Sequence, residues 1–270
     1  MGERVESVRV DGHRVAYARA GAGPPVVLLH GGVSDHREWR RQIADLSGRF
    51  DVVAWDAPGC GGSSDPPGSF RTEDYADVLS GLVNALGLGR PHVVGLSWGG
   101  GLAIALAHRH PGVPASLTLA GAYAGWAGSL PADIVAERLR GCMRQADLPP
   151  GDWVREWLPG LLTPAAPPEM VDELVGIMLD VHPAGFRTMA RSFAACDLRD
   201  ALPGIATPTL LIHGALDSRS PVHVGEAIAA RIPGARLVVL PGVGHMVDME
   251  AAAAFTAELT RFLDGIADGG

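Results

Sequence analysis

Three residues that together can activate a hydroxyl group each follow an apolar segment and a glycine-containing turn in this chain. The first, Ser97, is the centre of the segment 95–99, which reads Gly-Leu-Ser-Trp-Gly between a strand-like and a helix-like apolar run. In such a sharp turn the two glycines let the strand and the helix approach closely, and the serine adopts strained backbone angles. Its hydroxyl then lies at a helix N-terminus, where backbone N–H groups can bind an oxyanion. The pattern predicts that Ser97 is a nucleophile.

A serine hydroxyl needs a base to take its proton and a carboxylate to orient that base. Asp217 follows an apolar segment at residues 208–213, and His245 lies in a glycine-containing loop after the segment 236–240. The chain order Ser97, Asp217, His245 is the one expected of a hydrolase built on this type of turn. Asp248 is a second candidate for orienting the histidine, although its position favours an acidic residue at a helix N-terminus.

The apolar segments alternate with amphipathic ones, which predicts strands alternating with helices. We expect strands near residues 26–30, 51–55, 91–96, 115–120, 208–213 and 236–240, and helices near residues 36–47, 72–87, 98–110, 222–232 and 248–264. Such alternation predicts an α/β fold with a mostly parallel sheet covered on both faces. Asp11-Gly12 predicts a hairpin of two antiparallel edge strands near the N-terminus. The three candidate residues all follow strand C-termini, where ligands bind in open α/β sheets.

A long interval separates the fourth and fifth central strands, and it exceeds what a single crossover needs. Its prolines predict several short helices, and apolar residues such as Met170, Leu174 and Met178 recur at helical spacing. We therefore expect a helical cap at residues 123–203, inserted between core segments 1–122 and 204–270. An apolar cap over a serine site favours a substrate with a hydrophobic portion.

Four segments resemble the α/β-hydrolase superfamily. Residues 26–32, Val-Val-Leu-Leu-His-Gly-Gly, resemble its strand and His-Gly oxyanion loop. Residues 51–64 resemble the strand and the Asp-x-x-Gly-x-Gly-x-Ser loop that precede the serine turn. The serine turn and the Asp217/His245 pair complete the set. The resemblance implies the α/β-hydrolase fold, a twisted sheet with helices on both faces and a helical cap insertion.

The resemblance also implies a role for each site residue. Ser97 would attack a carbonyl, His245 would take and return the proton, and Asp217 would fix the histidine tautomer. Relatives that open epoxides or remove halides use an aspartate nucleophile, and Ser97 stands in its place. Those two chemistries are therefore not expected.

Two backbone N–H groups complete the implied site. Those of Gly32 and Trp98 would bind the oxyanion, with Val33 as the alternative to Gly32. We expect Val33, Trp126 and Met246 to contact substrate.

The basic residues exclude several cofactors. All 22 are arginine, and the chain contains no lysine. A Schiff base needs a lysine amine, and a phosphate-binding loop needs Gly-Lys-Ser/Thr, so neither can form. Residues 59–62, Gly-Cys-Gly-Gly, do not complete a dinucleotide-binding motif, and no histidine pair has metal-ligand spacing. We expect no cofactor and no metal.

The net charge and the cysteine content indicate which binding partners and which cellular compartment to expect. A net charge of −8 with scattered arginines argues against nucleic acid or an anionic membrane as a partner. Three cysteines at unrelated spacings, without a secretory segment, are typical of free thiols in a cytoplasmic protein. The oligomeric state stays open.

These observations predict a serine hydrolase that cleaves a small to medium hydrophobic carboxylic ester or lactone through an acyl-enzyme. Thioester, peptide and carbon–carbon bond hydrolysis use the same residues. A lyase, a cyclase or a ligand receptor could use the same pocket without hydrolysis.

Overall fold

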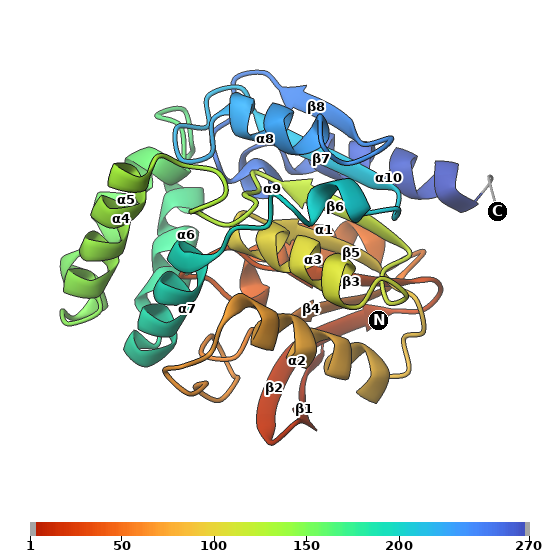
Figure 1. Cartoon of the computed structure of the whole chain (residues 1–270), viewed down its shortest axis with the longest axis horizontal. Coiled ribbons are helices and arrows are strands. Elements are labelled where there is room, and N and C mark those ends of the chain that lie inside the picture. The colour runs from red at the N-terminus through yellow and green to blue at the C-terminus, as the bar shows by residue number, and fades with distance from the viewer. Residues whose placement is uncertain (1–3, 268–270) are drawn as a thin grey trace.

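The computed structural model describes residues 4–267, which build one eight-stranded sheet in the order β1-β2-β4-β3-β5-β6-β7-β8 (Figure 1). The strands are β1 (Arg4–Val10), β2 (His13–Gly21), β3 (Pro25–Leu29), β4 (Asp51–Trp55), β5 (His92–Leu96), β6 (Ser116–Ala120), β7 (Thr209–Gly214) and β8 (Arg236–Leu240). The six strands from β4 to β8 run parallel, and β1 and β2 are antiparallel to their neighbours. The expected fold class is confirmed.

The N-terminal hairpin forms at the predicted turn. Asp11 and Gly12 both have positive φ angles, 47° and 85°, as a two-residue turn that matches the twist of the strands requires. The expectation of two edge strands is wrong for one of them. β1 is the edge, but β2 lies inside the sheet because its second side pairs with β4, Tyr17 opposite Trp55.

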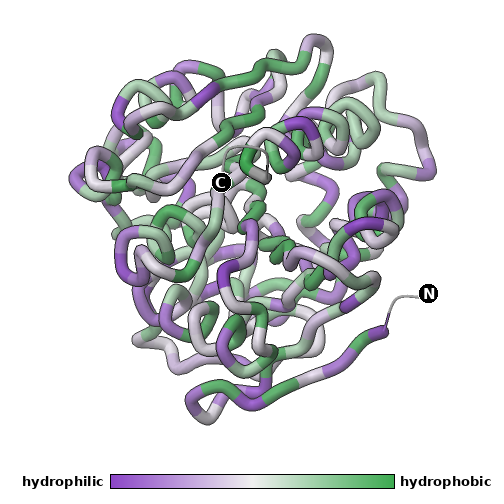
Figure 2. Tube along the Cα trace, turned by 90° about the vertical axis from the view of Figure 1, so that its right-hand side faces the viewer, coloured by the Kyte–Doolittle hydropathy of each residue, from purple (hydrophilic) through white to green (hydrophobic). Residues whose placement is uncertain are grey.

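The helices of the core cover both faces of the sheet. Helices α2 (Thr72–Ala85) and α3 (Trp98–Arg109) pack against each other, and α8 (Val222–Ala229) packs on β7 and β8. Helices α1 (Arg40–Leu46) and α10 (Ala252–Ala267) pack together behind the sheet in Figure 1. Apolar positions run through the interior and mix with hydrophilic ones along the surrounding helices (Figure 2). Burial on both faces explains why the parallel strands read as continuous apolar runs.

Two predicted helices are each divided. The segment 36–47 begins as a 3-10 turn, His36–Trp39, and continues as α1; Asp35 caps the turn by accepting a hydrogen bond from the Arg37 N–H at 2.9 Å. The segment 248–264 is divided into α9 (Val247–Glu250) and α10. The residue between them, Ala251, has φ −128° and ψ 41°, which are not helical angles.

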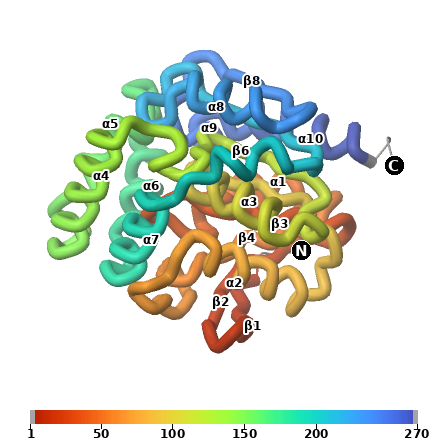
Figure 3. The backbone as a smooth tube through the Cα atoms, viewed as in Figure 1, coloured from red at the N-terminus to blue at the C-terminus, as the bar shows by residue number. Residues whose placement is uncertain are grey.

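The interval between β6 and β7 contains four α-helices, which lie together at one end of the sheet (Figures 1 and 3). They are α4 (Ala132–Gln145), α5 (Val154–Leu161), α6 (Pro168–Leu179) and α7 (Pro183–Ala195). Pro168 and Pro183 stand at the first positions of their helices, where the missing N–H group costs nothing. We call these four helices the cap. Across residues 4–267, no helix combines the length and the apolar character needed to cross a membrane.

Candidate active site

The turn between β5 and α3 holds Ser97 in a strained conformation, with φ 54° and ψ −111°. A Cβ atom on Gly95 would lie 2.3 Å from the Gly99 carbonyl oxygen, and one on Gly99 would lie 2.2 Å from that of Leu29. Both glycines are therefore required by close backbone approach. Such backbone strain costs about 1–3 kcal/mol and persists only where the surroundings enforce it. Here the Ser97 N–H donates to the Ala120 carbonyl at 2.7 Å.

Asp217 and His245 meet beyond the ends of β7 and β8. The Nδ1 atom of His245 lies 2.7 Å from Oδ2 of Asp217, and both side chains are buried. The other oxygen of Asp217 accepts from the N–H groups of Arg219 at 2.9 Å and Ser220 at 2.8 Å. Burial by itself raises the pKa of Asp217, but the charge and hydrogen bond of His245 and the Ser220 amide outweigh burial and lower that pKa. The ionised carboxylate holds Nδ1–H and leaves Nε2 for proton exchange.

Gly121, at the end of β6, makes room for this pair. It has a φ of 48°, and a Cβ atom there would lie 3.2 Å from the His245 ring and 3.3 Å from Asp217. The sequence analysis did not single out Gly121, because one glycine among 36 carries no signal of its own.

Asp248, the second candidate, does not orient the histidine. It lies in the first turn of α9, as its position predicts, and is fully buried. No hydrogen bond from the described residues reaches either carboxylate oxygen. Burial raises its pKa to about 7.

A cavity between the cap and the core contains most of the predicted site residues. Ser97, His245, Gly32, Val33, Trp98, Trp126 and Met246 all line it, and Asp217 lies behind His245. The space amounts to about 560 Å³, counting the part open to solvent. Half of the other lining residues are apolar and come from the cap: Trp157, Leu161, Leu174, Met178, Met189 and Phe193. The cavity is also lined by two ionisable side chains, Glu38 and Arg219. The sequence analysis did not single out either residue.

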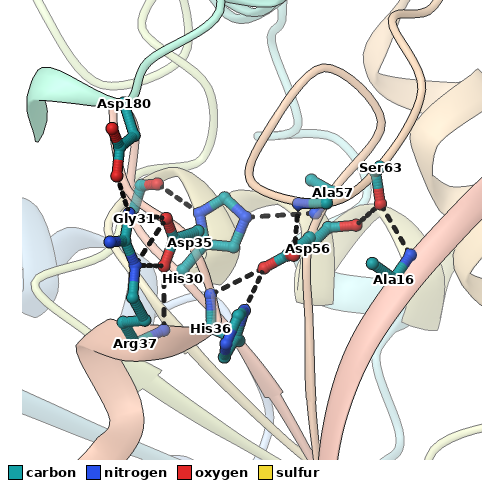
Figure 4. A network of polar contacts seen from close by, with 11 residues as sticks. Ala16, His30, Gly31, Asp35, His36, Arg37, Asp56, Ala57, Ser63 and Asp180 are labelled. Carbon is teal, nitrogen blue, oxygen red and sulfur yellow. Dashed lines mark hydrogen bonds and ion pairs between the residues drawn. The ribbon is translucent and has the colours of Figure 1, made fainter. Parts of the chain in front are cut away.

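The loop after β3, which also lines the cavity, has a strained backbone. Val33 has a φ of 57°, which a β-branched residue rarely adopts. Gly31 donates its N–H to the buried Glu38 carboxyl at 3.1 Å, and Gly31 O lies 2.7 Å from His30 Nδ1. His30 Nε2 accepts from the Ala57 N–H at 3.1 Å, so Nδ1 carries the proton (Figure 4). Burial lowers the pKa of His30, which keeps the ring neutral in this role.

A polar network extends from this loop, as Figure 4 shows. The ligand-type atoms of Asp35, His36 and Asp56 lie within 4.8 Å of one another. However, Asp35 binds the Arg37 guanidinium, and Asp56 accepts from the N–H and Nδ1 of His36, both at 2.8 Å, and from Gly62 N–H. These contacts show that the cluster joins the two loops to each other. His36 is not among the residues that line the cavity.

The cap contacts the histidine loop directly. The carbonyl oxygen of Leu161, the last residue of α5, accepts from the N–H groups of His245 and Met246, both at 3.1 Å. The Glu250 carboxylate accepts from the N–H of Thr163 at 2.7 Å and from that of Gly244 at 2.7 Å. Cap and histidine loop are therefore joined through backbone atoms on both sides of His245.

Three buried thiols and one buried imidazole have shifted pKa values. Cys60, Cys142 and Cys196 are free, as predicted, and burial raises the pKa of Cys142 and of Cys196 to about 11. Neither ring nitrogen of the buried His213 has a hydrogen-bond partner among the described residues. Burial lowers its pKa to about 4, so the ring packs as a neutral group against Gly225.

Comparisons with known proteins agree with this geometry. The model of the alpha/beta hydrolase family matches residues 26–259. A thermophilic esterase from Thermogutta terrifontis, solved with malate bound, is 30% identical with a TM-score of 0.90, over 97% of this chain and 99% of that chain. The enol-lactonase from Burkholderia xenovorans LB400 is 27% identical with a TM-score of 0.88, over 96% of this chain and 100% of that chain. A putative carbamate hydrolase from Pantoea ananatis is 28% identical over 88% of this chain and 87% of that relative. The chain belongs to the alpha/beta hydrolase family.

Proposed function

We propose that this protein is a serine hydrolase that cleaves a small to medium hydrophobic carboxylic ester or lactone. The observation that carries the proposal is the 2.7 Å contact between His245 and Asp217, in a cavity that also presents the strained Ser97. This is the arrangement that activates a serine hydroxyl in unrelated hydrolases.

The reaction proceeds in two steps. Ser97 Oγ bonds to the carbonyl carbon while its proton passes to His245 Nε2, and the carbonyl electron pair moves onto oxygen. The N–H groups of Gly32 and Trp98 bind that oxyanion, with Val33 N–H as the alternative to Gly32. When the tetrahedral intermediate collapses, the bond to the leaving alkoxide breaks and His245 returns the proton to it. Water then attacks the acyl-enzyme with the same proton transfers and releases the acid and the free serine.

The lining of the cavity supports a hydrophobic substrate. Trp126 and Met246 line the wall together with the six apolar cap residues, and Val33, Leu96 and Trp98 add further apolar surface. Apolar lining with a few polar groups is typical of small-molecule sites. The similar structures include one named an esterase and one named an enol-lactonase, which favours an ester or lactone as the substrate.

The test is covalent labelling by an alkyl fluorophosphonate, followed by intact mass. We expect one adduct on the wild-type protein and none on Ser97→Ala or His245→Ala, because only an activated serine reacts. Ester and lactone turnover is measured on the same three proteins. A folded wild-type protein that forms no adduct, or His245→Ala that keeps full ester hydrolysis, contradicts the proposal and favours a lyase or a ligand receptor.

A further inference from the structure

Arg219 places a positive charge in the wall of the active-site cavity. It lies two residues after Asp217, and its own N–H is one of the two donors to that carboxylate. Its carbonyl oxygen accepts from the Tyr123 hydroxyl and from Arg138 Nη2, the latter at 3.0 Å. The backbone of Arg219 is thus held from both sides, and the position of its side chain follows from the same loop that positions the catalytic pair.

The cap holds the Arg219 side chain in one place. The guanidinium carbon lies 4.3 Å from the centre of the Trp157 ring, a close cation–π contact. A Cβ atom on Gly160, one helical turn after Trp157 on α5, would lie 3.2 Å from Arg219 Cγ, so the glycine makes space for the stem. The indole is fixed in turn, because Trp157 Nε1 donates to Gln145 Oε1 at 3.0 Å.

This guanidinium has no acidic partner in the protein. Among residues 4–267, no carboxylate lies within 4.0 Å of it, whereas Arg19, Arg37 and Arg109 each bind an aspartate. Asp217 contributes only at longer range and is bound to His245. The half-buried side chain has no acidic partner, and burial, together with the nearby Arg138 charge, lowers its pKa.

The other acid of the cavity wall does not supply the missing charge. Glu38 is fully buried, and burial together with the nearby Asp248 raises its pKa well above the ordinary range. Both of its carboxyl oxygens lie within hydrogen-bond distance of the Gly31 N–H, at 3.1 and 3.3 Å, and it makes no ion pair with Arg219. The cavity therefore combines apolar walls with an arginine that has no acidic partner, which favours an anion on the bound molecule.

We propose that Arg219 binds a free carboxylate of the substrate, so that the natural substrate is an ester or lactone that also carries a carboxylate. This inference rests on the proposed hydrolase function. The guanidinium carbon lies over the Trp157 ring, and no acidic side chain among residues 4–267 pairs with its N–H groups, which are therefore available to a ligand. A carboxylate matches the planar guanidinium fork with two oxygens.

The experiment compares two esters that differ in one charge. Mono-(4-nitrophenyl) adipate carries a free carboxylate, and methyl 4-nitrophenyl adipate is its neutral counterpart; each kcat/KM is corrected for the spontaneous rate. We expect the wild-type protein to prefer the anionic ester, and Arg219→Met to reduce the ratio of the two kcat/KM values by about 10- to 100-fold, as loss of a charge-assisted hydrogen bond predicts. Arg219→Lys should keep part of the preference, because it keeps the charge without the planar fork.

Arg140→Met is the matched control. Arg140 is an exposed residue of α4 with no acidic partner within 4.0 Å among residues 4–267, and it does not line the cavity. Removal of its charge should keep the wild-type ratio. An equal fall of the ratio in Arg140→Met would show a general effect of net charge and overturn the proposal.

A binding measurement separates this inference from the proposed function. Adipate is titrated calorimetrically into Ser97→Ala and into Ser97→Ala/Arg219→Met, with adipamide as the neutral control. Tighter binding of adipate that depends on Arg219 supports the carboxylate site whether or not the protein turns over an ester. Wild-type protein that hydrolyses the neutral ester but shows no preference for the anionic one, together with Arg219-independent adipate binding, overturns the carboxylate site and leaves the hydrolase intact. Absence of a fluorophosphonate adduct overturns the hydrolase instead.

Discussion

Two buried aspartates lie near His245, Asp217 in the loop after β7 and Asp248 in helix α9, and their surroundings are opposite. Asp217 accepts hydrogen bonds from two backbone N–H groups and contacts the histidine ring. Asp248 has no hydrogen bond to its carboxylate from residues 4–267. Burial raises the pKa of both groups. The neighbouring imidazole and the Ser220 amide reverse that rise for Asp217, whereas the N–H groups of Asp248 and Met249 only reduce it for Asp248.

The difference shows that depth of burial does not decide the charge of a carboxyl group. The loop after β7 turns two N–H groups inward toward Asp217, as an anion requires. Helix α9 places Asp248 against the core near Glu38, a second buried acid, and each disfavours ionisation of the other. The surroundings of Asp217 keep an ionised carboxylate next to His245, as catalysis requires. The surroundings of Asp248 disfavour its charged form, which costs stability where the unfolded chain would be ionised.

The largest expected effect comes from making the same amide substitution in both aspartates. Asp217→Asn should reduce kcat for the neutral ester by roughly 10⁴-fold, because the amide no longer fixes the histidine tautomer. Asp248→Asn should change kcat by less than about threefold, because its carboxyl contacts neither the histidine nor the cavity. Steady-state kinetics on both variants, with circular dichroism to verify folding, measures the contrast. Equal losses would assign Asp248 a part in catalysis.

The second expected effect is that Asp248 and Asp217 change the pH dependence of stability in opposite directions. The pKa of Asp248 rises from 3.8 to about 7 on folding, so between these values the unfolded chain is ionised while the folded protein holds the proton. Its contribution therefore lowers stability as pH rises through this window, by at most about 1.4 kcal/mol per pH unit. For Asp217 the sign is reversed: its lowered pKa adds stability above pH 3.8, which is lost at lower pH.

Asp248→Asn should accordingly gain stability over the wild-type protein at pH 8 and little at pH 4. Urea unfolding of both proteins at the two pH values gives the difference in the free energy of unfolding. A difference that is equal at pH 4 and pH 8 would mean that the Asp248 carboxyl ionises normally in the folded protein.

The smallest expected effect is a loss of stability on substitution of Glu250, the third acidic residue of this region. Like Asp217, Glu250 accepts hydrogen bonds from two backbone N–H groups. Glu250→Ala leaves the N–H groups of Thr163 and Gly244 without their acceptor and should cost about 1–3 kcal/mol of stability. Glu226→Ala, which removes an exposed glutamate from α8, is the matched control and should stay within about 0.5 kcal/mol. Thermal unfolding measures both. Similar small losses in the two variants would show that Glu250 does not join the cap to the histidine loop.

Much of the fold follows from local patterns in the chain. The strand 51–55 and the Asp11-Gly12 hairpin turn were predicted at the residues where they form, because alternation and turn chemistry depend on near neighbours. The boundaries that failed, as at Ala251, depend on backbone angles imposed by packing. The inner position of β2 also escaped prediction, because the pairing partner of a strand is chosen across the sheet.

The candidate site divides in the same way. The chain by itself predicted that Ser97, Asp217 and His245 lie together, because each stands at a glycine-marked turn after a strand and parallel strands bring such turns to one edge of the sheet. Only the tertiary structure decided between Asp217 and Asp248, because both are aspartates at helix or loop starts and differ only in what surrounds their oxygens. The tertiary structure also distinguished Arg219 from the other 21 arginines. Its guanidinium carbon lies over the Trp157 ring, and no acidic side chain among residues 4–267 lies within 4.0 Å of the guanidinium group. Local sequence sets conformation and residue type, whereas the partners of a charge are set by segments far apart in the chain.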